Sequence, residues 1–249
     1  MLTLGAGLTA AIRWGPLYRG PLPDLRPGSV SVPVGVNFGA GLEKTMERWT
    51  SAQRLRTMRA VARLGARWVR IDVPYLGPRR PWGDAAVVTA ALAAGLHVDA
   101  LLDDWSADRR PPPGLFAAFA ARVAGAYARR GVEVYEVLNE ENLGSNWGGA
   151  ASAPGYAALL GRVYRAVKAA DPRATVLVGG LSPAPAGGGD VAPVAFLQEL
   201  YAAGAGGSFD GVAVHPYTYP GLPSIVDPSN SFAQMVRLRR VMSSHGDGG

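Results

Sequence analysis

The sequence predicts an α/β protein with the (β/α)8 TIM-barrel fold, with about six strand–helix units in its 249 residues. Short apolar runs alternate with helical patterns from residue 33 onward, as expected for parallel strands joined by helical crossovers. The runs are almost wholly apolar, which indicates strands buried on both faces. The units recur roughly every 35 residues, so eight of them would extend to about residue 313.

Six runs are expected to be strands because they are short and apolar and are bounded by turn-forming residues. They cover residues 33–39, 66–75, 97–104, 132–142, 174–183 and 209–220. Helical spacing of apolar residues follows each strand, over 50–65, 85–96, 114–131, 154–172, 192–206 and 231–246. In the first of these helices, Leu55, Met58 and Val61 share one face, and Gly65 is expected to end it. Residues 33–249 are therefore expected to form one barrel domain that is incomplete at its C-terminal end.

Residues 1–32 are expected to form an irregular N-terminal lead-in, because four prolines between Pro16 and Pro27 exclude a long helix. The first twelve residues are apolar up to Arg13, but they lack the basic start of a secretory signal. No apolar run reaches the roughly 18–20 residues of a membrane span. The sequence thus predicts no membrane span and shows no clear signal peptide.

Composition excludes several classes of protein. Hydrophobic residues make up 48 % and charged residues 18 % of the chain, which is typical of a globular domain. The absence of cysteine excludes a disulfide scaffold, a thiolate nucleophile and a Cys-ligated zinc site. The three histidines lie far apart in the sequence, at 97, 215 and 245, so no metal site and no cofactor are predicted.

The net charge of +6 and the pI near 9.9 invite a nucleic-acid interpretation. Nearly all the cations are arginines spread over polar helix faces, such as Arg54, Arg56 and Arg59, with lysine only at 44 and 168. This distribution favours a compositional bias over a nucleic-acid partner. A steep salt dependence of DNA binding would overturn that interpretation.

A doubly wound dinucleotide-binding fold is the main alternative architecture. It requires G-x-G-x-x-G after the first strand. Gly39 and Gly41 begin this pattern, but Lys44 stands where the third glycine is needed, and no P-loop is present. The pattern therefore favours the barrel.

In (β/α) barrels the active site lies at the carboxyl ends of the strands. The ends of the expected strands carry Asn37, Arg70, Asp72, Asp103, Trp105, Asn139, Glu140, His215 and Tyr217. Glu140 follows an apolar run, and a carboxyl beside apolar walls is suited to donate a proton near neutral pH. Tryptophans in the segments after the first four strands, at 49, 82, 105 and 147, suit the flat faces of sugar rings. Structural roles stay open, since Arg70 and Asp72 share a strand face and are suited to an ion pair.

Residues 135–147, YEVLNEENLGSNW, resemble the strand-4 signature of clan A glycoside hydrolases, the cellulase-like barrel enzymes. Asn139, Glu140 and Asn142 match that signature, whereas Leu138 replaces its usual Trp and Glu141 its usual Pro. Residues 156–183 and 196–220 are similar to the following units of family 39 and family 5 enzymes, including the ending His-Pro-Tyr.

The resemblance implies a retaining hydrolase of β-linked glycosides that uses a carbohydrate substrate and no cofactor. It makes Glu140 the general acid/base and Asn139 the partner of the sugar 2-hydroxyl. Arg70 matches an arginine that supports the nucleophile, and His215 and Tyr217 match residues at the cleavage point. Candidate substrate-binding residues are also Trp105 and Trp147, by sugar stacking, and Asn37, at the end of the first strand. Enzymes of this kind usually act outside the cell.

The departure from the family pattern concerns the nucleophile, a Glu at the end of a seventh strand. No such strand follows the sixth unit, so the chain is expected to be truncated before it and to have no or very weak hydrolase activity alone. The open edges of the first and sixth strands predict poor solubility. A non-catalytic carbohydrate-binding barrel relic is the alternative, and a barrel enzyme using Arg70, Asp72 and Glu140 for other chemistry is a further one. The sequence does not indicate the sugar, endo or exo action, or the oligomeric state.

Overall fold

The computed structural model describes residues 35–37, 44–78, 85–105, 110–184, 186–218, 220–224, 226–227 and 230–247. The expected irregular segment 1–32 lies outside these residues. In the part of the chain that is described, no helix is both long enough and apolar enough to cross a membrane.

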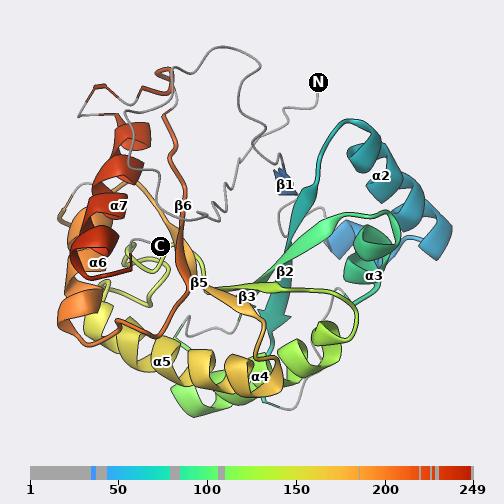
Figure 1. Ribbon diagram of the computed structural model, residues 1–249, viewed down its shortest axis with the longest axis horizontal. Helices are drawn as coiled ribbons and strands as arrows, with labels where there is room; N and C mark the ends of the chain where they lie inside the picture. The colour runs from blue at the N-terminus through green and yellow to red at the C-terminus, as the bar shows by residue number, and fades with distance from the viewer. Residues whose placement is uncertain are drawn as a thin grey trace.

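Six parallel strands form one curved sheet in sequence order, so every crossover joins neighbouring strands (Figure 1). The strands are β1 (Gly35–Asn37), β2 (Trp68–Tyr75), β3 (His97–Asp104), β4 (Val134–Val137), β5 (Thr175–Leu181) and β6 (Gly211–Val214). Within the described residues, β1 pairs only with β2 and β6 only with β5. The arrangement is a partial (β/α)8 barrel, which confirms the predicted fold class.

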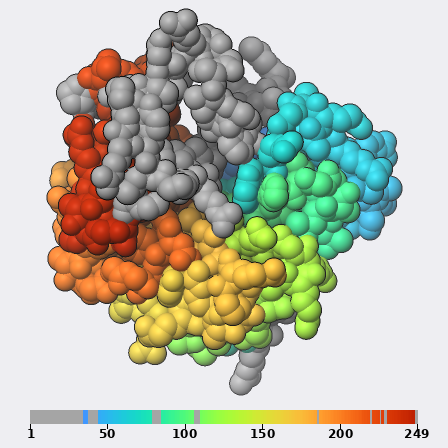
Figure 2. All heavy atoms as spheres, in the orientation of Figure 1, coloured from blue at the N-terminus to red at the C-terminus, as the bar shows by residue number. Residues whose placement is uncertain are grey.

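The helices cover the convex side of the sheet (Figure 1). They are α2 (Ser51–Arg63), α3 (Ala85–Ala93), α4 (Pro113–Ala128), α5 (Ala153–Ala170), α6 (Pro193–Ala202) and α7 (Gln234–Ser244), with a 3-10 turn η1 (Ser231–Ala233) before α7. The space-filling view shows them as a continuous outer wall, from α2 in cyan to α7 in red (Figure 2). N-cap side chains fix the first residues of two helices. The Thr50 hydroxyl accepts from the Gln53 amide in a capping box at the start of α2, and Ser152 caps α5.

Two of the expected strands after β1 are less than half as long as predicted. The run 132–142 forms a strand only over Val134–Val137, because Leu138 turns to a positive φ of 62° and leaves the extended conformation. The run 209–220 forms a strand only over Gly211–Val214. Pro216 follows shortly and has no N–H to donate to a ladder. Both early endings release side chains at the mouth of the barrel.

The two faces of the sheet bury different chemistry. Along β2, Val69 and Ile71 face the helices and belong to the main apolar core. Arg70 and Asp72 alternate with them and face the concave side, where both are nonetheless buried. A small apolar layer of Val134, Leu177 and Ala213, with Trp68 against it, forms a separate cluster. Both faces are buried as predicted, but the concave face carries a charged layer as well as an apolar one.

Candidate active site

The end of β4 presents Asn139 and Glu140 on a sharply bent backbone. Leu138 and Glu140 have φ angles of 62° and 59°, which side chains other than glycine rarely adopt. Such left-handed residues cost roughly 1–2 kcal/mol each. Hydrogen bonds hold the bend: the Leu138 amide donates to the Leu102 carbonyl at 2.8 Å, and the Leu143 amide donates to the Glu140 carbonyl at 2.9 Å. The bend turns two consecutive polar side chains into the site.

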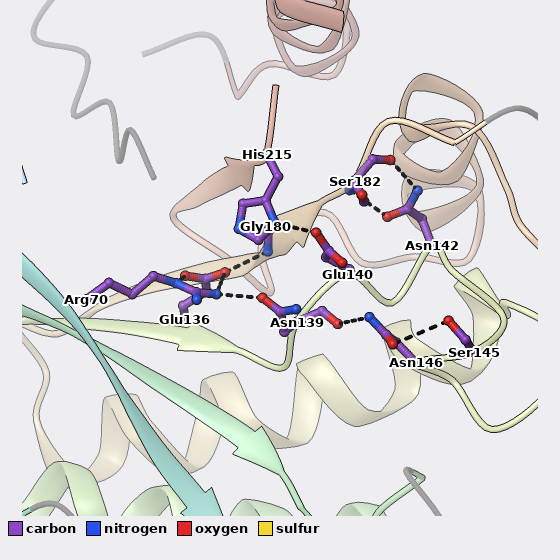
Figure 3. Close-up of polar contacts among 10 residues, drawn as sticks. All are labelled: Arg70, Glu136, Asn139, Glu140, Asn142, Ser145, Asn146, Gly180, Ser182 and His215. Carbon is purple, nitrogen blue, oxygen red and sulfur yellow. Dashed lines mark hydrogen bonds and ion pairs between the residues drawn. The ribbon is translucent and has the colours of Figure 1, made fainter. Parts of the chain in front are cut away.

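Glu140 meets His215 across the barrel mouth (Figure 3). The His215 Nδ1 atom lies 2.6 Å from Glu140 Oε1, and the two side chains are 4 % and 16 % exposed, respectively. The imidazole stacks closely over Gly180, where a Cβ would come within 2.2 Å of Nε2. Within the described residues, His215 Nε2 is buried without a hydrogen-bond partner. Glu140 is therefore the more accessible member of a pair whose other member is held by packing.

A second polar cluster lies beside this pair and joins three strands (Figure 3). Arg70 from β2 donates from Nε and Nη2 to the two carboxylate oxygens of Glu136 on β4, at 2.7 and 2.8 Å. The same Nη2 donates to Asn139 Oδ1 at 2.8 Å. The Gly180 amide on β5 donates to Glu136 Oε1 at 2.7 Å. Arg70 thus pairs with Glu136 and Asn139, while Asp72, beside it on the same strand face, acts on it through its charge.

Burial and charge act in opposite directions in this cluster. Burial raises the pKa of Glu136, but the Arg70 guanidinium outweighs it and the pKa lies below its ordinary value. Burial raises the pKa of Asp99 well above its ordinary value, and the Glu136 charge raises it further. The pKa of Asp72 is also raised by burial, although Arg70 opposes the shift. Glu136 is therefore the carboxylate that neutralises Arg70, and the pKa of the neighbouring Asp99 is shifted in the opposite direction.

Glu141 is buried immediately behind Glu140. Neither of its carboxyl oxygens has a hydrogen-bond partner among the described residues. Burial raises the pKa of Glu141 well above its ordinary value, and the nearby Glu136 and Asp103 charges add to the shift. Gly179 provides the space, since a Cβ there would lie 2.4 Å from Glu141 Oε2. The buried carboxyl group therefore favours its protonated form over a wider range of pH than an exposed glutamate does.

Asn142 fastens the segment after Glu140 to β5. Its Nδ2 atom donates to the Ser182 and Val191 carbonyls at 2.8 and 2.9 Å, and its Oδ1 accepts from the Ser182 amide at 2.9 Å. The side chain is fully buried. Asn142, which matches the family signature, thus has a structural role: it holds the segment after Glu140 against the end of β5.

The two tryptophans expected to stack on sugars lie in different environments. Trp147 is 3 % exposed and packs edge-on against Tyr156 in the core. This burial corrects the expectation for Trp147, because neither ring face is open to a sugar. Trp105 is half-buried, donates from Nε1 to Asp103 Oδ2 at 3.0 Å, and lies 4.1 Å from the Lys44 ammonium. Burial raises the pKa of Asp103 to about 6.

Two other expected site residues lie at the barrel mouth or on its edge strand. Tyr217 is 49 % exposed, and its ring centroid lies 5.3 Å from that of His215. Asn37 is half-buried on β1, in register with Arg70 of β2. Trp82 lies outside the described residues. The described part of the chain holds no group of three or more His, Asp or Glu side chains placed to bind a metal ion.

Sequence reasoning did not assign Glu136, Gly179, Gly180 or Glu141 to the site. Glu136 carried a signal, because a charged residue inside an apolar strand needs a buried partner. Glu141 carried another, since it stands where the family signature has proline. The sequence gave no signal for Gly179 and Gly180, because the Glu141 carboxyl and the His215 ring that they accommodate come from distant positions.

Comparison with known proteins supports the fold. No family model and no curated protein matches the sequence. A monomeric β-xylosidase from Caulobacter crescentus CB15 is similar in structure, with a TM-score of 0.58 and 20 % identity over 85 % of this chain and 49 % of that one. A GH39 β-xylosidase from Caulobacter crescentus has the same TM-score and identity over 85 % and 50 %. A glucosidase from Croceicoccus marinus has a TM-score of 0.55 and 13 % identity over 78 % and 44 %.

These likenesses define the class of fold. The chain has the (β/α)-barrel architecture of these glycosidases and spans about half the length of each of them. The resemblance to clan A glycoside hydrolases read from residues 135–147 is thus confirmed in the fold. At sequence identities of 20 % and below, the substrate and activity of those proteins cannot be assigned to this chain.

Proposed function

We propose that this chain is the barrel part of a glycoside hydrolase that cleaves β-linked glycosides with retention of configuration, with Glu140 as general acid/base. One observation carries the proposal: Glu140 is a partly exposed carboxyl at the carboxyl end of β4, held 2.6 Å from His215 Nδ1. A general acid must be accessible to the leaving oxygen and fixed in direction, and this pairing supports both requirements.

The neighbouring residues support the same chemistry. Glu140 protonates the leaving oxygen in the first step and takes a proton from water in the second. We assign Asn139, which is adjacent to Glu140 in the sequence and half-buried, to binding of the sugar ring. Tyr217, exposed beside His215, is suited to line the subsite at the cleavage point.

Retention also needs a second carboxylate, about 5–5.5 Å from the first. The family resemblance assigns it to a seventh strand, and the described residues form six. We therefore assign the nucleophile to none of the described residues, and expect residues 1–249 alone to turn over glycosides weakly or not at all. Reading the coding sequence past the codon of Gly249 tests this assignment: an apolar strand ending in Glu would supply the missing carboxylate.

The first substrates to test are aryl β-xylosides and aryl β-glucosides, in line with the activities named for the similar structures. The natural protein that contains these residues is assayed with and without Glu140→Gln. We expect the variant to lose on the order of 10²–10⁴-fold in turnover of substrates with poor leaving groups, and much less with good ones. Added azide should restore turnover and yield a β-glycosyl azide, because azide needs no general base.

Glu133→Gln, at an exposed position before β4, is the matched control and should leave turnover unchanged. Unchanged activity in Glu140→Gln would contradict the role of Glu140. Sugar binding without turnover by the natural protein would support the alternative, a non-catalytic carbohydrate-binding barrel. We also propose that the enzyme acts outside the cell, as suits its substrate class; recovery of activity only from the cytoplasmic fraction would refute this.

A further inference from the structure

The amide of Asn139 is held in one orientation. Arg70 Nη2 donates to Asn139 Oδ1 at 2.8 Å, and a guanidinium has only donors (Figure 3). Rotation of the amide by 180° would bring its NH2 group against that donor. Oδ1 therefore faces Arg70, and Nδ2 is left as the group that Asn139 offers to a ligand.

Arg70 is itself immobilised. Glu136 takes two of its donors in a bidentate pair at 2.7 and 2.8 Å, which fixes the plane of the guanidinium. Glu136 is fixed in turn by the Gly180 amide at 2.7 Å. Arg70 is 6 % exposed and Glu136 is fully buried, so water does not compete for these contacts.

We propose that Glu136 is a positioning residue that acts through Arg70 to hold Asn139 Nδ2 as a hydrogen-bond donor beside Glu140. This inference rests on the proposed function. It assigns Arg70 to the orientation of Asn139, and it names a substrate class. The sugar must place a hydrogen-bond acceptor, such as a hydroxyl oxygen, against Nδ2.

A sugar with an ammonium group at that position presents only donors to Nδ2. The family resemblance puts the sugar 2-position against Asn139, so with that placement we expect selectivity for 2-hydroxy glycosides over 2-amino-2-deoxy glycosides in their protonated form. A purely structural Arg70–Glu136 pair would stabilise the barrel without any dependence on the sugar substituent. The two roles thus differ in how a Glu136 variant responds to the substrate.

The experiment compares the natural protein with Glu136→Gln, Asn139→Ala and the double variant. For each, kcat/KM is measured on an aryl β-glycoside and on its 2-deoxy analogue. Asn139→Ala should lose roughly tenfold to a hundredfold on the 2-hydroxy substrate and far less on the 2-deoxy substrate. Glu136→Gln should show a smaller loss with the same substrate dependence, and the double variant should lose no more than Asn139→Ala.

Removing one partner of a buried ion pair can unfold the chain. Glu136→Asp keeps the charge and withdraws the carboxylate by one methylene. In this variant, which is expected to stay folded, the kcat/KM values on the 2-hydroxy and 2-deoxy substrates are compared in the same way. Equal losses on both substrates in the Glu136 variants, or no loss on either, overturn the inference while leaving the proposed function in place. No turnover by the unmutated natural protein is a different result, since it removes the proposed function and this inference together.

Discussion

His215 Nδ1 and Glu140 Oε1 lie 2.6 Å apart, although the two residues are 75 positions apart in the sequence. The contact joins the ends of β6 and β4. Gly180 of β5, between them, has no side chain, and its position is where the imidazole ring rests. The direction of the Glu140 carboxyl is therefore set by a residue two strands away.

Replacing His215 tests this contact directly. His215→Phe keeps an aromatic ring of somewhat larger size but removes the nitrogen that meets Glu140, so we expect turnover to fall on the order of 10²-fold. His215→Asn places an amide near Nδ1 and should retain considerably more activity. Both are measured on an aryl β-glycoside with a poor leaving group, for which proton donation matters most. Equal activity in the two variants would show that the contact is packing alone.

Gly179 is expected to tolerate no side chain. A Cβ would lie 2.5 Å from the Leu138 carbonyl oxygen and 2.4 Å from Glu141 Oε2, and the backbone cannot yield as a side chain can. Gly179→Ala should therefore lower the free energy of unfolding by about 1–3 kcal/mol. Chemical denaturation measures the effect.

The matched control for that substitution is Gly125→Ala in α4. A Cβ at Gly125 meets only the Ala170 side chain, at 4.0 Å. Alanine is favoured over glycine inside a helix, so this variant should gain roughly 0.5–1 kcal/mol. A Gly179→Ala variant as stable as the control would contradict the close packing at the end of β5.

Glu141 should make the stability of the chain depend on pH. Its folded pKa lies well above its unfolded value of about 4.3, so between these values the folded state holds a proton that the unfolded state has released. Its contribution to stability is therefore complete below about pH 4 and falls as the pH rises toward the folded pKa.

Glu141→Gln removes this titration. The variant should match the unmutated chain near pH 4 and exceed it increasingly at higher pH, by up to about 1.4 kcal/mol per pH unit. Urea denaturation at several pH values measures the difference, with the exposed Glu133→Gln as control. A difference that shrinks as pH rises would show that the Glu141 carboxyl is ionised in the folded chain.

Asn142→Ala should unfasten the segment that follows Glu140. The substitution removes hydrogen bonds to Ser182 and Val191 and leaves the buried amide and carbonyl of Ser182 without Asn142 as a partner, so we expect the free energy of unfolding to fall by about 2–4 kcal/mol. Hydrogen exchange should accelerate at the Ser182 amide, which loses its acceptor. Ser145→Ala, at an exposed position in the same segment, should change stability by less than about 0.5 kcal/mol.

The order of strands and helices could be predicted from the sequence, because each strand and each helix depends on local chemistry. The alternation of apolar runs and helical patterns predicted six strands and six helices, and Gly65 follows the end of α2 as expected. The positions of Glu140 and His215 at strand ends also followed, since parallel strands present their carboxyl ends on one side.

The environments of individual side chains were not open to prediction in the same way. Tryptophan is a residue type that commonly stacks on sugars, yet the turn after Glu140 places Trp147 against Tyr156 in the core. Arg70 and Glu136 are 66 positions apart and meet because β2 and β4 face one concave surface. Sequence spacing alone carries no information on such contacts.

The sequence by itself determined the order of strands and helices, the side of the sheet on which polar strand ends gather, and the candidate acid Glu140. These depend on period, turn residues and chain direction, which are local properties. Only the tertiary structure decided that Arg70 engages Glu136 and Asn139, that Glu140 is directed by His215, and that Glu141 is buried with no hydrogen-bond partner among the described residues. These outcomes depend on the curvature of the sheet, which brings side chains from separate strands together and buries most of them.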